Sequence, residues 1–393
     1  MTIDSRRANV RRITRRLTAT ALSVGAAAVL AACGSSSDGG GSASTGGGSG
    51  GGGGDMAAVK AAAQKKIDAG TAPVKFLAPG PAFDISKAKG KEIWIVCNDT
   101  SLPFVQQVVK GFNEAAGVAG TKARLFNAKG ETSTAARGIQ QAVAAKASAI
   151  VVFGITFKYV QQAVSDAKAA GIPVVGALNV DVKADLEKDA AGEVSIDYGK
   201  SGELIAAYAI ANTEQPANAV YQNLPGIDTF AAMKAGVERG FAECPECKLK
   251  TVDFTGDFKT AEATQTPSTL ARDPKVNWII PAIDGMAQFA VPAIKAAGKG
   301  DKVQVGSINA VAGNLALIQK GDVQTVDVGN NNQWFGWAMV DRTLRAINGE
   351  QPAISEVPVK ALVKENLDGK DVADEDAVFD DVDYRGEYRK LWK

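Results

Sequence analysis

The chain has 393 residues, and its 44 lysine and arginine residues nearly balance its 43 aspartate and glutamate residues, leaving a formal net charge of +1. That balance gives no electrostatic reason to expect a nucleic-acid partner. The sequence contains no histidine, which removes the commonest general base and the commonest zinc ligand and so argues against most enzyme classes. The length is sufficient for two ordinary domains with terminal segments.

The first 33 residues have the pattern of an export signal. Six arginines between positions 6 and 16 precede an apolar stretch at residues 17–30, which is too short for a comfortable membrane span. The sequence then reads Leu30-Ala31-Ala32-Cys33-Gly34, which resembles the lipobox of bacterial lipoproteins. This resemblance implies cleavage before Cys33 and attachment of a lipid to its thiol. A plain signal peptide is the alternative, and the arginines do not decide between the general and twin-arginine export routes.

A glycine- and serine-rich tract follows at residues 34–54. Such a segment buries no apolar surface and behaves as flexible coil, so we expect it to be a linker. An alanine- and lysine-rich helix is predicted over residues 56–69, and a proline-rich extended arm follows it. We therefore assign residues 55–90 to an N-terminal helix and arm.

The stretch from residue 92 to residue 117 combines a strand, a polar turn and a helix. Apolar residues at 93–97 predict a buried strand. Pro103 suits the first turn of a helix, and apolar residues recur behind it at helical spacing. The polar turn between them, at residues 98–101, would lie at the carboxyl end of the strand, which is where open parallel sheets bind ligands.

The alternation of strand and helix continues along the chain at roughly 25–30 residue spacing, which is typical of parallel sheets covered by helices on both faces. The further predicted strands are 123–127, 149–153, 172–178, 193–196, 219–222, 249–254, 276–281, 302–306, 323–328 and 356–363. The further predicted helices are 132–147, 157–170, 200–212, 229–242, 261–272, 286–297, 312–319 and 334–347. Two α/β halves with facing sheet edges would enclose a cleft that closes about the connecting segments.

The last residues carry an acidic segment and a short aromatic tail. We expect the acidic segment, residues 371–383, to be a solvated surface, because the sequence offers no neighbouring partner for its charge. Tyr384, Leu391 and Trp392 are expected to attach the tail to one lobe.

Three cysteines remain besides Cys33. Cys244 and Cys247 form a Cys-Pro-Glu-Cys segment that has too few partners for a zinc site and that follows a helix, unlike a thioredoxin-type redox pair. In an oxidising compartment we expect a small structural disulfide between them. Cys97, inside the first strand, is expected to be a buried hydrophobic residue, and its redox state is left open.

Several segments together resemble the type I periplasmic-binding-protein family, and its ribose- and galactose-binding branch in particular. The resemblance covers about residues 91–360 and rests on EIWIVCNDTSLPFVQQVVKGFNEAA, AIVVFGI, AGIPVVGALN, GVERGF, DPKVNWIIPAIDGMAQFAVPAIKAAG and VQVGSINA. It implies an α/β fold of two Rossmann-like lobes joined by three crossings, near residues 196–197, 329–330 and 357–358. The N-terminal lobe would comprise 91–197 and 331–357, and the C-terminal lobe with the tail 198–330 and 358–393.

The family resemblance also implies which positions contact the ligand. We expect the ligand to be bound by polar and aromatic residues at strand ends and at the second crossing: Asn98, Asp99, Phe104, Phe153, Asn179, Asp284, Asn309, Asn330 and Trp334. Helix capping is the alternative for Asn98 and Asp284, a place in the core for Phe153, and an amide-rich turn for residues 330–332. Replacing Trp334 or Asn330 by alanine is expected to abolish ligand binding and to leave the melting of the unliganded protein nearly unchanged.

The departures from the sugar-binding pattern concern charge. The Asp-Arg pair of sugar-binding members is replaced by Leu178-Asn179, and Ala235 stands near the position of another arginine. A site without arginine disfavours anions. The resemblance therefore implies an uncharged ligand, which we expect to be a sugar or polyol, with a less polar cyclic molecule as the alternative.

No catalytic set is found. Gly199-Lys200-Ser201 lacks the earlier glycine of a phosphate-binding loop, and Ser201 has neither a nucleophile-elbow pattern nor a histidine to activate it. We therefore expect no enzyme activity, no metal and no cofactor. The resemblance implies a monomeric solute-binding lipoprotein of an ABC importer, lipid-anchored at the outer face of the cell membrane and acting with a membrane permease. A ligand-sensing receptor component on the same fold is the alternative function.

Overall fold

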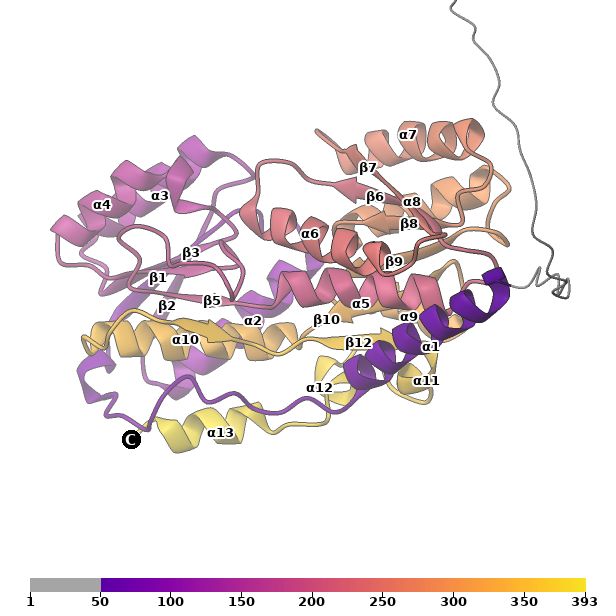
Figure 1. Cartoon of the computed structure of the whole chain (residues 1–393). Coiled ribbons are helices and arrows are strands. Elements are labelled where there is room, and N and C mark those ends of the chain that lie inside the picture. Colours follow the sequence, from indigo (N-terminus) through magenta and orange to yellow (C-terminus); the bar gives the residue numbers. More distant parts are fainter. Residues whose placement is uncertain (1–50) are drawn as a thin grey trace, which may run out of the picture. The chain divides into compact units, whose positions relative to one another are not determined.

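The computed structural model describes residues 51–393 (Figure 1). The expected signal peptide and its lipidation residue Cys33 lie outside these residues, as does most of the expected linker. Helix α1 (Gly51–Thr71) begins before the predicted start at residue 56, so it includes the last four positions assigned to the linker. No helix in the described part of the chain is long and apolar enough to cross a membrane.

The first sheet is parallel throughout and has the strand order β11-β5-β4-β3-β1-β2. Its strands are β1 (Glu92–Cys97), β2 (Lys122–Asn127), β3 (Ala149–Phe153), β4 (Val174–Ala177), β5 (Gly192–Ser195) and β11 (Ile354–Glu356). Successive residues of β1 enter two different cores, Ile95 on one face and Val96 on the other, as the two-residue period of a strand requires. The helices of this lobe are α2 (Pro103–Val118), α3 (Thr132–Ala144), α4 (Gln161–Ala169), α10 (Asn332–Ile347) and the 3-10 helix η2 (Phe157–Tyr159).

The second sheet has the order β12-β10-β9-β8-β6-β7 and is parallel except for β12, which runs antiparallel to β10. Its strands are β6 (Asn218–Asn223), β7 (Lys248–Asp253), β8 (Trp278–Pro281), β9 (Gln304–Ile308), β10 (Gln324–Gly329) and β12 (Lys360–Val363). Its helices are α5 (Tyr198–Ala211), α6 (Asp228–Ala242), α7 (Phe258–Arg272), α8 (Asp284–Ala296) and α9 (Ala312–Lys320). The predicted fold class, two α/β lobes with parallel sheets, is confirmed.

The chain passes between the sheets three times: after β5, after β10 and between β11 and β12. The last passage corrects the sequence-based prediction of a single strand over residues 356–363. That segment divides because Val357 and Val359 flank Pro358, which has no N–H to donate to a neighbouring strand. The two short strands that result belong to different sheets.

The acidic segment is only partly the solvated surface that was expected: Asp371, Asp374, Asp380 and Asp383 are exposed, whereas Glu375 and Asp381 are largely buried. Asp381 forms an ion pair of 2.7 Å with Lys360, and both side chains are almost fully buried. The carboxylate of Glu375, in the short helix α12 (Glu375–Val378), accepts a hydrogen bond from the backbone N–H of Gln333 in the first turn of α10. A carboxylate is favoured at this position by the unpaired N–H groups and the dipole of the helix. These partners are distant in sequence, so the local composition gave no sign of them.

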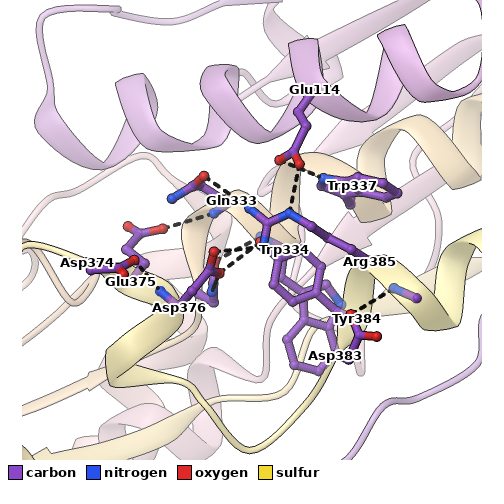
Figure 2. A network of polar contacts seen from close by, with 12 residues as sticks. Glu114, Gln333, Trp334, Trp337, Asp374, Glu375, Asp376, Asp383, Tyr384 and Arg385 are labelled. Carbon is purple, nitrogen blue, oxygen red and sulfur yellow. Dashed lines mark hydrogen bonds and ion pairs between the residues drawn. The ribbon is translucent and has the colours of Figure 1, made fainter. Parts of the chain in front are cut away.

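Arg385 connects the tail to both α12 and the first lobe (Figure 2). Its guanidinium lies 2.8 Å from the carboxylate of Glu114 in α2 and 2.7 Å from that of Asp376 in α12. A weaker hydrogen bond of 3.3 Å reaches the side chain of Gln333. Arg385 is the second residue of helix α13 (Tyr384–Leu391). These contacts therefore fix the start of the tail helix.

Aromatic stacking holds the tail and the N-terminal arm against α10. The ring of Trp334 lies parallel to that of Tyr384, with centroids 5.5 Å apart, and it also stacks on Phe76 of the arm at 6.0 Å. Trp337 stacks on Trp392 at 5.4 Å. The arm, which contains the 3-10 helix η1 (Ser86–Ala88), pairs with the last residues of the chain through a short parallel bridge. The expected attachment of the tail through Tyr384 and Trp392 is therefore seen, and it is made to α10.

The second lobe contains a buried pair of carboxyl groups, Asp284 and Asp327. Asp284 accepts hydrogen bonds from Val311 N–H at 2.8 Å and from the Ser307 hydroxyl. Asp327 accepts one from Ala310 N–H at 3.0 Å, and no donor among the described residues reaches its Oδ2. Burial, and then the charge of Asp284, raises the pKa of Asp327 well above its ordinary value. One proton shared between the two carboxyls therefore accounts for the pair.

We expect Trp334→Ala to destabilise the protein by about 3 kcal/mol or more, because the indole ring is 2% exposed and its removal leaves a cavity beneath the tail. Urea unfolding followed by circular dichroism measures the change, with Leu77→Ala as the control because Leu77, on the N-terminal arm that packs against α10, is 44% exposed. This reverses the sequence-based expectation that the unliganded melt is unchanged. Equal, small effects of the two substitutions would contradict the packing role.

We expect the contribution of the Asp284 and Asp327 pair to the free energy of unfolding to fall as pH rises above the ordinary aspartate pKa of 3.8, because a folded-state pKa above the unfolded value means that unfolding releases a proton. In Asp327→Asn the side-chain amide can still donate a hydrogen bond to Asp284, but it has no proton that titrates. The stability of this variant should therefore depend less on pH than that of the natural chain. Denaturant unfolding at several pH values provides the slopes. Asp301→Asn, at an exposed position, serves as the control, and a slope unaltered by Asp327→Asn would contradict the shared proton.

Candidate functional site

A cavity of about 140 Å³ lies where the two lobes meet, and both lobes contribute to its walls. The first lobe contributes Asn98, Asp99, Leu102, Phe104, Val105, Phe153, Gly154 and Leu178. The second lobe contributes Tyr198, Leu224, Ile227, Thr229, Phe230, Phe258 and Ile283. Larger hollows of about 310 and 900 Å³ are each lined by a single lobe. The smaller cavity is the candidate site, because it lies at the carboxyl ends of the strands, where α/β sheets bind ligands.

The polar side of the cavity comes from the turn after β1. Asn98 continues the edge of the sheet, donating its N–H to the carbonyl of Phe153 at 2.9 Å. The carboxylate of Asp99 accepts hydrogen bonds from both the backbone N–H and the hydroxyl of Ser101, at 2.9 and 2.8 Å. These local bonds shape the turn and leave the Asn98 amide at the cavity wall.

Pairs of aromatic rings form much of the remaining wall. Phe104 and Phe153 meet edge to face in the first lobe, with centroids 6.3 Å apart. Tyr198 and Phe230 meet in the same way in the second lobe, at 6.2 Å. Burial raises the pKa of the Tyr198 phenol further above the usual value. This phenol therefore stays neutral at physiological pH.

The lips of the cavity are joined by two polar contacts between the lobes. Lys158 of η2 forms an ion pair of 2.6 Å with Asp228, the first residue of α6. Tyr159 of η2 donates its hydroxyl to the carbonyl of Gly226 at 2.8 Å. Both contacts span the two lobes, so the structure shows the lobes closed over the cavity.

Four of the expected ligand-binding residues line this cavity: Asn98, Asp99, Phe104 and Phe153. Asn179 does not. Its amide is used within the first lobe, accepting from Ile155 N–H at 2.8 Å and donating to the carbonyl of Val152 at 3.1 Å. Asp284 is also absent from the lining, because it belongs to the buried carboxyl pair described above.

The expected residues at the second crossing also lie elsewhere. Trp334 is covered by Tyr384 and Phe76 and does not line the cavity. Asn330 donates from its amide to the carbonyl of the next residue, and Asn309 accepts at its own carbonyl from the side chain of Asn332. The contacts of Asn330 fit the amide-rich turn that was the alternative for residues 330–332, whereas the side-chain oxygen of Asn309 has no hydrogen-bond partner among the described residues.

Sequence reasoning missed the second-lobe wall. Leu224 and Ile227 lie in the turn after β6, and Phe230 and Phe258 lie in the first turns of α6 and α7. These positions could have been selected because they follow predicted strands at the ligand-binding edge. They were overlooked because apolar residues at helix starts are usually part of the core.

The cysteines follow the prediction where the structure describes them. Cys244 and Cys247 form a disulfide. Cys97 is a buried free thiol whose pKa is raised by burial to about 12. Within residues 51–393 no cluster of side chains suitable for a metal ion is found.

Comparisons with known proteins agree with this architecture. A family model described as a periplasmic binding protein domain matches residues 93–351, which is more than half of the chain. A search of curated proteins gave no match.

Solved structures share the fold at low sequence identity. A 5-methylthioribose transporter solute-binding protein from Thermotoga lettingae, in complex with 5-methylthioribose, is 20% identical with a TM-score of 0.68, covering 77% of this chain and 94% of that one. The Caulobacter myo-inositol binding protein, bound to myo-inositol, is 23% identical with a TM-score of 0.64, covering 74% and 97%. A solute-binding protein from Actinobacillus succinogenes with bound D-allose is 22% identical with a TM-score of 0.63, covering 70% and 98%.

The structure has two lobes joined by three crossings and a cavity between the ends of their strands, and the family model matches most of the folded chain. The chain belongs to the periplasmic binding protein family, whose members bind small solutes outside the cytoplasm for ABC importers.

Proposed function

We propose that this chain captures an uncharged sugar or polyol in the interlobe cavity and presents the closed, liganded form to an ABC permease. The observation that supports this proposal is that residues at the strand ends of both lobes line the cavity. A ligand bound there gains contacts with both lobes only when they close, so binding and closure are coupled. The sugars and cyclitol bound by the solved structures of the same fold support the ligand class.

The preference for a neutral ligand follows from the charges around the cavity. Neither lysine nor arginine is among the residues that line it. Its one carboxylate, Asp99, is already hydrogen-bonded twice by Ser101. An anionic ligand would lose its hydration here without gaining an ion partner, which is costly in an apolar setting. A cationic ligand would meet only one carboxylate, which is already shared with Ser101.

The lipobox-like segment supports a lipid anchor at Cys33, with the linker before α1 as a tether. A monomer on the outer face of the cell membrane, close to its permease, is the arrangement that this proposal implies. The wall and lips of the cavity lie within the single chain and need no second copy.

We expect at least one of D-allose, myo-inositol and 5-methylthioribose to raise the melting temperature of the protein, since a ligand that binds only the folded state stabilises it by mass action. Asn98→Ala should raise the dissociation constant of that ligand by about tenfold or more, because a ligand hydroxyl would lose its hydrogen bond to the Asn98 amide. Gln140→Ala, an exposed amide on α3, should bind as the natural chain does. Full ligand response in Asn98→Ala would place the site elsewhere.

We expect Tyr159→Phe to raise the dissociation constant by about fivefold, because the closed form loses one hydrogen bond of about 1 kcal/mol between the lobes. The change should appear mainly as faster dissociation, measured by stopped-flow mixing, because the contact forms only after closure. Tyr208→Phe removes a hydroxyl from a half-buried tyrosine that does not line the cavity and is the matched control. An unaltered dissociation rate in Tyr159→Phe would show that this lip contact does not hold the closed state.

A further inference from the structure

Few side chains in the cavity can form hydrogen bonds with a ligand. Among its fifteen lining residues, the polar side chains are Asn98, Asp99, Tyr198 and Thr229. Tyr198 and Thr229 belong to the second lobe, and the Asp99 carboxylate in the first lobe accepts hydrogen bonds from Ser101. Within the described part of the chain, nothing hydrogen-bonds the side-chain amide of Asn98. The free polar capacity therefore comprises this amide and the unused lone pairs of the Asp99 carboxylate in the first lobe, and the hydroxyls of Tyr198 and Thr229 in the second lobe.

The rest of the wall is apolar, and each lobe contributes five apolar side chains. Those of the second lobe are Leu224, Ile227, Phe230, Phe258 and Ile283. Those of the first lobe are Leu102, Phe104, Val105, Phe153 and Leu178. Apolar ligand surface placed here is removed from water with a gain in free energy, and flat aromatic faces suit the C–H surface of a ring.

A ligand with hydroxyls around its whole ring does not match this distribution. Hydroxyls directed at the phenylalanine and leucine side chains would lose their water partners and gain none, and each unpaired hydroxyl weakens binding. A ring with hydroxyls on one edge and an apolar remainder satisfies both sides. Its hydroxyl edge would meet Asn98 and Asp99, and its apolar end would meet the second-lobe wall.

We propose that the ligand is a partly deoxygenated or alkyl-substituted ring, such as an alkylthio sugar or a cyclic diol, in preference to a fully hydroxylated sugar or cyclitol. This inference rests on the proposed function and narrows its ligand class. The selectivity is assigned to the wall formed by Leu224, Ile227, Phe230 and Phe258, and the polar contacts are assigned to Asn98 and Asp99.

The test compares two matched pairs of probes by isothermal titration calorimetry on the full folded chain. The first pair is D-ribose and 5-methylthioribose, which differ by replacement of one hydroxyl with a methylthio group. The second pair is myo-inositol and cis-cyclohexane-1,2-diol. In each pair we expect the less hydroxylated probe to bind more tightly, by about tenfold or more for 5-methylthioribose over D-ribose.

Two variants connect that preference to the wall. Phe258→Ala should reduce the ratio of the two affinities in the ribose pair, whereas a purely structural role would weaken both probes alike and leave the ratio unaltered. Leu224→Ala, on the same wall, gives a second measurement if Phe258→Ala folds poorly. Asn98→Ala should lower the affinities for both probes of a pair and leave the ratio of those two affinities unaltered.

The outcomes separate this inference from the function on which it rests. Equal or tighter binding of D-ribose and myo-inositol, lost in Asn98→Ala, would overturn the inference and retain the proposed function. An affinity ratio that neither wall variant alters would also overturn it, as would the absence of binding by both 5-methylthioribose and the cyclic diol. Tight binding of any probe that Asn98→Ala, Phe258→Ala and Leu224→Ala leave unchanged would overturn the cavity assignment itself.

Discussion

The position of the cleft depends on two pairs of helices that approach so closely that only glycine fits at their contacts. A Cβ atom on Gly111 of α2 would lie 2.1 Å from the carbonyl oxygen of Gln333 in α10. In the other lobe, a Cβ on Gly236 of α6 would lie 2.0 Å from the carbonyl oxygen of Gly199 in α5. Helices α10 and α5 begin directly after the second and first crossings. These contacts therefore hold the segments at which the chain leaves each sheet, and they determine where the strand ends meet.

Segments outside the family match reinforce α10. The N-terminal arm, α12 and α13 lie before residue 93 or after residue 351, yet their aromatic rings and carboxylates surround the first turns of that helix. Trp334 is stacked between Tyr384 and Phe76, while Arg385 joins α2 to α12. The first turn of α10, which looks like a polar hinge in the sequence, thus makes structural contacts, and its Trp334 does not line the interlobe cavity.

The chemistry of the cavity follows from which strand ends supply it. The turn after β1 brings one amide and one carboxylate, and the first turns of α6 and α7 bring phenylalanines. Because the carboxylate is engaged locally and no cation is present in the lining, we expect recognition to combine a few hydrogen bonds with burial of apolar surface. The lip contacts of Lys158 and Tyr159 then stabilise closure without touching the cavity lining.

The sequence by itself determined the alternation of strands and helices, the two lobes and the first-lobe wall at Asn98 and Phe104, because hydrophobic periodicity and turn chemistry act over a few residues. Only the tertiary structure determined where Trp334, Asp284 and the acidic tail segment lie and what they contact. Their partners lie in distant segments: Trp334 meets Tyr384, and Asp381 meets Lys360. A side chain's own chemistry determines its preference for burial. Whether it is buried in a core, beneath a tail or in a cleft depends on which sequence-distant surface packs against it.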